Sequence, residues 1–166
     1  MNFLEKNGLK IFIFLFLTIS YSIIAETKKL LILGDSISAG YGIKESENWV
    51  QLLETSLKLS GIQLNIVNSS ISGDTTIGGL SRIESDLAKY KPNYVLIELG
   101  GNDALRGYPI NKIKRNLLKI IDNVSRTKAK PIIMQIRIPP NYGKKYVSAF
   151  ESIYSEIAEE KNIPKM

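Results

Sequence analysis

The chain of 166 residues contains no cysteine and no histidine. The lack of cysteine excludes disulfides, thiolate zinc sites and a cysteine nucleophile. The lack of histidine excludes most transition-metal sites, and it removes the base that usually takes the proton of a serine nucleophile near neutral pH. We therefore expect no transition-metal site of the usual kind, and we expect any serine chemistry to lack its usual base within these residues.

The chain is moderately basic, with a formal net charge of +6. Lysine and arginine are scattered along the sequence rather than massed, which favours a solvated basic surface over a nucleic-acid-binding one. Hydrophobic residues make up 44% of the chain, which is enough to bury a core in one domain. We expect a monomer with no nucleic-acid partner and with at most transient contact with a membrane surface.

The N-terminal segment has the pattern of a targeting sequence. Lys6 and Lys10 precede an apolar run at residues 11–24, and Ala25 follows as a small residue suited to cleavage. The run is short for a membrane span, so a signal peptide over 1–25 is favoured over an uncleaved anchor. We expect an exported bacterial protein, periplasmic or secreted, with a single domain over 26–166.

Beyond this segment, short apolar runs alternate with amphipathic segments. Such alternation predicts a parallel sheet covered by helices, which is an α/β fold. The predicted strands lie at 29–33, 63–67, 94–99 and 131–136, and the predicted helices at 49–57, 77–90, 110–124 and 146–157. Residues 162–166 resemble the approach to a fifth strand, and a domain that naturally has four strands is the alternative.

The first predicted strand ends in Gly34, Asp35 and Ser36. In open parallel sheets, ligands bind at the carboxyl ends of the strands. Small residues at this end permit a tight turn and close approach of a substrate, with Ser36 exposed at the strand tip. On its own, however, this tripeptide favours a helix cap, in which the polar side chains accept N–H groups of a following helix.

The next two strand ends carry candidate oxyanion donors. Gly73, in the segment 68–75, can present an unobstructed backbone N–H to a developing oxyanion, and Asn102 can add its neutral side-chain amide. Helix capping by Asp74 or Thr75, and a glycine turn with a left-handed Asn, are the structural alternatives. Because the three segments share one edge of the predicted sheet, we interpret them together as one site.

These blocks, Gly-Asp-Ser, a glycine block and Gly-x-Asn-Asp, resemble the SGNH (GDSL-type) hydrolases, in particular the bacterial periplasmic thioesterase I, lysophospholipase and arylesterase group. Matching segments lie at 71–75, 98–107 and 134–143, and the resemblance runs from about residue 29 to the last residue. It implies a flavodoxin-like, three-layer α/β/α fold with strand order 2-1-3-4-5. It also implies hydrolysis of acyl-thioesters, lysophospholipids and aryl esters without metal or cofactor.

The resemblance assigns roles to individual residues. It implies Ser36 as the nucleophile, and an oxyanion hole made by the Ser36 and Gly73 backbone N–H groups and the Asn102 side chain. The small acyl ester, thioester or lysolipid substrate is expected along the loops at 103–108 and 137–142. The residues expected to contact it are Asp103, Leu105, Tyr108, Pro139 and Tyr142.

One block of the family is absent from the chain. The Asp-x-x-His pair that supplies the base and its orienting carboxylate does not occur, and the fifth strand and last helix are expected to be missing with it. Asp35 and Asp103 do not replace it, because a carboxylate of ordinary acidity is a poor base towards a serine hydroxyl. We therefore expect a serine hydrolase whose chain is C-terminally incomplete. The alternatives are an inactive acyl- or lipid-binding remnant and a nonfunctional pseudogene product.

Overall fold

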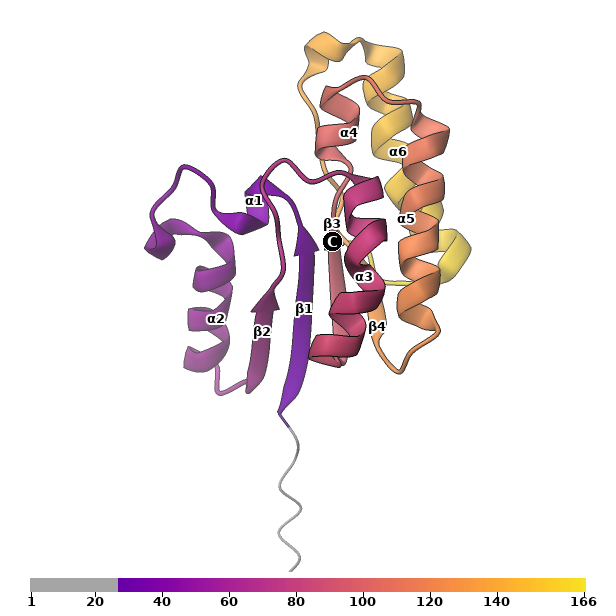
Figure 1. Cartoon of the computed structure of the whole chain (residues 1–166). Coiled ribbons are helices and arrows are strands. Elements are labelled where there is room, and N and C mark those ends of the chain that lie inside the picture. Colours follow the sequence, from indigo (N-terminus) through magenta and orange to yellow (C-terminus); the bar gives the residue numbers. More distant parts are fainter. Residues whose placement is uncertain (1–26) are drawn as a thin grey trace, which may run out of the picture.

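A four-stranded parallel sheet organises the protein (Figure 1). The computed structural model describes residues 27–166, so the predicted signal peptide lies outside the described residues. The strands follow the order β2-β1-β3-β4, which confirms the expected α/β class and strand order for these four strands. Their bounds are β1 Lys28–Gly34, β2 Leu64–Asn68, β3 Tyr94–Glu98 and β4 Lys130–Ile133.

Helices cover both faces of the sheet. One core cluster joins Leu31 and Leu33 of β1 to buried side chains of α3, α5 and α6, while Leu30 and Ile32 point to the other face, where α2 packs. This alternation within a continuous apolar run is the reason that β1 is buried on both sides. The helices are α1 Ser36–Ala39, α2 Trp49–Leu59, α3 Thr76–Tyr90, α4 Gly101–Leu105, α5 Ile110–Ser125 and α6 Lys144–Lys161, with 3₁₀ turns η1 Glu45–Glu47 and η2 Pro140–Tyr142.

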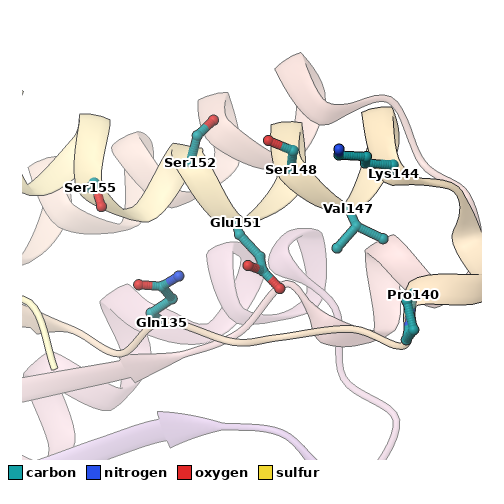
Figure 2. A pocket seen from close by; sticks show the side chains of 8 residues that line it. All are labelled: Gln135, Pro140, Lys144, Val147, Ser148, Glu151, Ser152 and Ser155. Atoms are coloured by element: carbon teal, nitrogen blue, oxygen red, sulfur yellow. The ribbon is translucent and has the colours of Figure 1, made fainter.

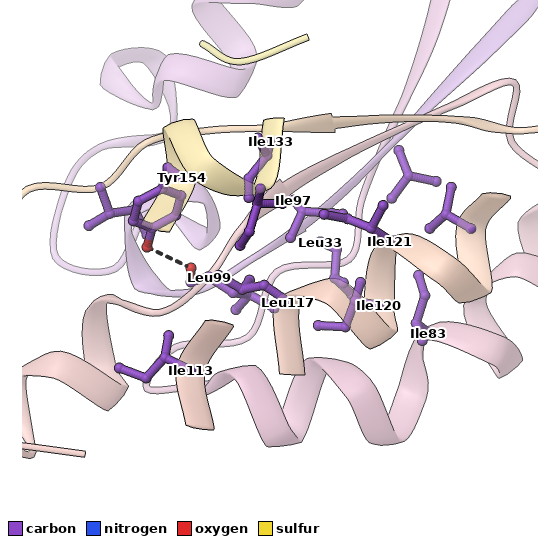
Figure 3. Close-up of a cluster of buried hydrophobic side chains, with 14 of the residues drawn as sticks. Leu33, Ile83, Ile97, Leu99, Ile113, Leu117, Ile120, Ile121, Ile133 and Tyr154 are labelled. Carbon is purple, nitrogen blue, oxygen red and sulfur yellow. Dashed lines mark hydrogen bonds between the residues drawn. The ribbon is translucent and has the colours of Figure 1, made fainter. Parts of the chain in front are cut away.

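One buried tyrosine of α6 packs in the main core cluster near the end of β3. Tyr154 lies fully buried among Ile97, Ile113 and Leu117, and its hydroxyl donates a hydrogen bond to the Leu99 carbonyl at 3.0 Å (Figure 3). A buried tyrosine needs such a partner for its hydroxyl. The bond fixes α6 against the end of β3, from which the segment with Asn102 begins.

Two parts of the predicted secondary structure are corrected. The fourth strand, predicted over 131–136, ends at Ile133. Beyond Ile133 the backbone makes isolated hydrogen bonds and no continuous strand ladder. The Met134 N–H donates to the Ile97 carbonyl, and the Gln135 N–H donates to the Met166 carbonyl. The short helices α1 and α4, each directly after a strand, were not predicted because they are too short to have a hydrophobic period.

The last described residues lie beside β4. Lys165 forms a parallel bridge with Ile133, and the Met166 N–H donates to the Ile133 carbonyl at 2.9 Å. Residues 165 and 166 therefore lie alongside the end of β4, while a fifth strand stays a prediction. None of the helices within residues 27–166 is long and apolar enough to cross a membrane.

Candidate active site

Ser36 stands where buried strand β1 turns into helix α1. Asp35 is the N-cap of this helix, and its Oδ1 accepts the Ile37 N–H at 3.0 Å. Ser36 is the first helical residue and is half-buried, so its own N–H has no acceptor inside the helix. The capping interpretation and the nucleophile interpretation thus describe two neighbouring residues of one turn and do not exclude each other.

Gly73 lies in the exposed loop between β2 and α3. Its φ of +79° is a left-handed conformation that favours glycine, and no atom lies within 4 Å of the place where a Cβ would stand. The Gly73 carbonyl accepts a hydrogen bond from Arg106 at 3.2 Å. Thr75, not Asp74, is the N-cap of α3. The loop therefore presents Gly73 at an open surface, as an approaching substrate requires.

Asn102 connects the other two segments. Its side-chain nitrogen donates to Asp35 Oδ2 at 2.9 Å and to the Asp74 carbonyl at 3.0 Å. Asp35 precedes Ser36, and Asp74 follows Gly73, so one amide group ties the three strand-end segments together. The left-handed residue in this turn is Gly100, with φ of +117°, while Asn102 itself is helical in α4.

The amide of Asn102 is fully used in this arrangement. A side-chain amide nitrogen carries two hydrogens, and both have acceptors, Asp35 Oδ2 and the Asp74 carbonyl. To donate to an oxyanion, Asn102 must give up or share one of these bonds. Catalytic hydrogen bonds often take their final geometry only in the complex with substrate.

Glu98 is an unpredicted carboxyl group directly behind the Ser36 turn. It is 1% exposed, and its Oε2 accepts the Ser38 hydroxyl at 2.7 Å and the Asp35 N–H at 3.4 Å. Burial raises the pKa of Glu98 to about 7, and the nearby charge of Asp35 acts in the same direction. Burial also raises the pKa of the Asp35 carboxyl. The signal in the sequence was a glutamate that ends an otherwise apolar strand.

Arg82 of α3 is a second unpredicted residue of the site. Its guanidinium bonds Asp74 and reaches the Gly34 carbonyl at 3.5 Å, so it touches both the Gly73 loop and the end of β1. No sequence signal distinguished it from the other basic residues on amphipathic helices.

The predicted substrate-binding residues fall into two groups. Leu105 and Tyr142 are exposed and adjacent, because the Tyr142 hydroxyl donates to the Leu105 carbonyl at 3.1 Å. Pro139 is exposed at the start of η2, and Tyr108 is half-buried. Asp103, by contrast, is 1% exposed, and its carboxylate accepts the Thr76 N–H and hydroxyl at 2.8 and 2.6 Å. A contact between Asp103 and substrate stays a prediction, and the contact seen here is with the start of α3.

A separate groove lies between α6 and the segment after β4. Figure 2 shows Gln135 and Pro140 on one side and Val147 and Glu151 of α6 on the other. None of Ser36, Gly73 or Asn102 lines it. The groove is therefore distinct from the three strand ends that carry the candidate chemistry.

A parallel α/β sheet with serine, glycine and asparagine at three neighbouring strand ends is the arrangement of an SGNH ester hydrolase. Residues 32–165 match the GDSL-like lipase/acylhydrolase family, and the chain belongs to that family. It is 46% identical over 140 residues to an arylesterase of Vibrio mimicus, covering 84% of this chain and 70% of the relative. It is 43% identical over 151 residues to thioesterase 1/protease 1/lysophospholipase L1 of Escherichia coli K12, covering 91% and 71%.

The fold of a solved relative agrees with this assignment. The psychrotrophic esterase EstA from Pseudoalteromonas sp., in a structure inhibited by monoethylphosphonate, superposes with a TM-score of 0.80 at 41% identity. The match covers 84% of this chain and 76% of that one. The resemblance seen in the sequence motifs is thus confirmed for the family, the fold and the class of ester hydrolase.

Proposed function

We propose that Ser36 is the nucleophile of a carboxylic ester and thioester hydrolase. The Ser36 hydroxyl oxygen attacks the acyl carbonyl carbon, and the alcohol or thiol leaves with the proton that the serine gives up. Water then attacks the acyl-serine ester, which releases the carboxylic acid and restores the hydroxyl. The observation that carries this proposal is the pair of bonds from Asn102 to the neighbours of Ser36 and Gly73.

The oxyanion formed in each step needs donors aimed at one point. The Ser36 N–H, the Gly73 N–H and the Asn102 amide are the candidates, and removing one such donor typically costs about 10²–10³-fold in kcat. The substrate class we propose is small acyl esters, acyl-thioesters and lysolipids. The names of the relatives, an arylesterase and a thioesterase/lysophospholipase, support this range.

A serine nucleophile needs a proton acceptor. Histidine does not occur in the 166 residues. Four carboxyl groups lie next to the site, and each is hydrogen-bonded to other groups. Asp35, Glu98 and Asp103 are at most 2% exposed, and the Asp74 carboxylate is held by Arg82 and the Thr75 N–H. We propose that these residues supply nucleophile and oxyanion donors and that the base is not among them. The same observation favours the second candidate function, an acyl or lipid binder without turnover.

Added imidazole tests the two candidates against each other. The chain is assayed with p-nitrophenyl butyrate over a series of imidazole concentrations, with Ser36→Ala as the blank for imidazole's own reaction and Ser46→Ala, an exposed serine of η1, as the matched control. Turnover that depends on both Ser36 and imidazole, with a phosphonate probe bound to Ser36 in the mass spectrum, is expected. Fatty-acid binding without either signal would favour the binder, and absence of all three would contradict both.

We also propose export by residues 1–25. The support is the basic start, the apolar run at 11–24 and Ala25. Expression of the full chain in a Gram-negative host, followed by intact mass measurement of the periplasmic fraction, should give a protein that begins at Glu26. A full-length chain that stays with the membrane fraction would support the uncleaved anchor instead.

A further inference from the structure

The guanidinium group of Arg82 lies at the centre of a polar cluster behind the Gly73 loop. Its side chain is 16% exposed. Nε and one terminal nitrogen bond Asp74 Oδ2, each at 3.0 Å, while the other terminal nitrogen bonds Ser69 Oγ at 3.0 Å and Asp86 Oδ2 at 2.9 Å. The cluster has two carboxylates for one cation, so every nitrogen of the fork has an acceptor.

These contacts hold the loop at both of its ends. Ser69 stands at the start of the loop, directly after β2, and Asp74 follows Gly73 at its end. The Ser69 hydroxyl also donates to Asp86 at 2.8 Å. Ser69 is thus bonded both to the Arg82 guanidinium and to the Asp86 carboxylate that pairs with it. A single side chain thereby fixes both flanks of the segment that contains Gly73.

The same guanidinium reaches the nucleophile strand. One terminal nitrogen lies 3.5 Å from the Gly34 carbonyl, the last residue of β1, and that carbonyl also accepts the Ile71 N–H at 3.1 Å. The loop and the strand that delivers Ser36 are thus joined through Gly34. Any shift of the loop away from β1 must break bonds at this point.

Asp74 is hydrogen-bonded by Arg82 at its side chain and by Asn102 at its backbone. Its Oδ2 is bonded by Arg82 and its Oδ1 by the Thr75 N–H at 2.9 Å, while its backbone carbonyl accepts from Asn102 at 3.0 Å. The carboxylate also occupies the space that a Cβ at Gly78 would need. The orientation of the peptide unit next to Gly73 is therefore set from both sides.

We propose that Arg82 is a positioning residue of the oxyanion hole, acting through Asp74 and Ser69 to aim the Gly73 N–H at the carbonyl attacked by Ser36. The proposal rests on the proposed hydrolase function. Lysine is a poor replacement, because an ammonium group cannot reproduce the planar fork that bonds Asp74, Ser69 and Asp86 together. A group that only balanced charge would tolerate the exchange.

The first test uses a readout that needs no turnover. Hydrogen exchange and the ¹H–¹⁵N resonance of the Gly73 amide are compared in the full chain, Arg82→Lys, Arg82→Gln and the control Lys114→Gln, which removes an equal charge from the α5–α6 ion pair. We expect faster exchange over 69–74 and a moved Gly73 resonance in both Arg82 variants. An unchanged loop in a folded Arg82→Gln, or an equal change in Lys114→Gln, would overturn the proposal.

The second test measures the imidazole-assisted hydrolysis described above. Arg82→Lys is expected to lower kcat by about 10–100-fold while KM changes less than 3-fold. The reason is that a mispositioned oxyanion donor reduces the stabilisation of the transition state more than the binding of the ester. Equal losses in kcat and in 1/KM, or a kcat equal to that of Lys114→Gln, would overturn it. Absence of Ser36-dependent turnover in the unmodified chain would refute the proposed function, and the exchange measurement would then still decide the role of Arg82 in the loop. If Arg82→Gln does not fold, Arg82→Lys decides both tests.

Discussion

Replacing Glu98 with glutamine should change how the stability of the protein depends on pH. Burial raises the pKa of Glu98 from 4.5 to about 7 in the folded chain, whereas the unfolded chain keeps the ordinary value. Below pH 4.5 the group is protonated in both states and contributes no difference. Between pH 4.5 and 7 the unfolded chain releases the proton while the folded chain keeps it, so the free energy of unfolding falls as the pH rises.

The size of this effect follows from the displacement of the pKa. At about 1.4 kcal/mol for each pKa unit, the rise corresponds to roughly 3 kcal/mol of stability lost between pH 4.5 and pH 7.5. Asp35 acts in the same direction, because its pKa is raised as well. Glutamine at position 98 has nearly the same shape, accepts the Ser38 hydroxyl through its amide oxygen, and has no charge to bury.

Urea unfolding followed by circular dichroism at pH 5, 6, 7 and 8 checks this prediction. We expect the curve of unfolding free energy against pH to be flatter in Glu98→Gln. As the pH rises, the unfolding free energy of the variant should increase relative to that of the unmodified chain. Glu54→Gln is the matched control, since Glu54 lies on α2 in a solvent-accessible ion pair with Lys58. A pH dependence of Glu98→Gln that equals that of the unmodified chain would refute the reasoning.

Three further substitutions probe the site and its support. Asn102→Ala should lower Ser36-dependent, imidazole-assisted kcat by about 10²–10³-fold with a smaller change in KM, and a kcat within 3-fold of the unmodified chain would contradict its role as an oxyanion donor. Gly100→Ala should lower the thermal midpoint more than Gly107→Ala, because both glycines have positive φ but only at Gly100 would a Cβ meet the Tyr154 hydroxyl, at 2.7 Å; equal losses would show that strain alone matters. Tyr154→Phe should cost about 1–3 kcal/mol in urea unfolding, since it leaves the Leu99 carbonyl without its donor, and a neutral result would mean that this carbonyl finds another partner.

Much of the fold was predictable because its signals are local. The apolar run that forms β1, the helical spacing that forms α5, and the end of α3 before Pro92 each depend on residues close in sequence. The end of β4 was not predictable in this way. Residues 134–136 are apolar enough to continue a strand, but their backbone finds only isolated partners in Ile97 and Met166.

The candidate site was predictable as a set of strand ends but not as a network. Ser36, Gly73 and Asn102 follow strands, so their common edge could be inferred from topology alone. Arg82 has no such marker, whereas Glu98 does end β3. The partners of both were not predictable because they are distant in sequence: Glu98 bonds Ser38, 60 residues away, and Arg82 reaches Gly34, 48 residues away. Contacts of this kind emerge only when the sheet has assembled.

The first two residues of the Gly-Asp-Ser motif are each required by their surroundings. At Gly34 a Cβ would stand 2.7–2.8 Å from Glu98 Oε2, Ser38 Oγ and Ser70 Oγ, so any larger residue must displace a buried polar cluster. At position 35 a carboxylate is needed because it serves two elements at once, with Oδ1 on the Ile37 N–H of α1 and Oδ2 on the amide of Asn102 in α4.

Asparagine at position 35 would lack one of those acceptors, since an amide has a single oxygen. It would also present N–H groups to the amide of Asn102, which is itself a donor. The carboxylate at position 35 therefore links α1 to Asn102 of α4. By this reasoning Asp35→Asn should loosen α1 from α4 even though it removes a carboxyl group whose burial is unfavourable.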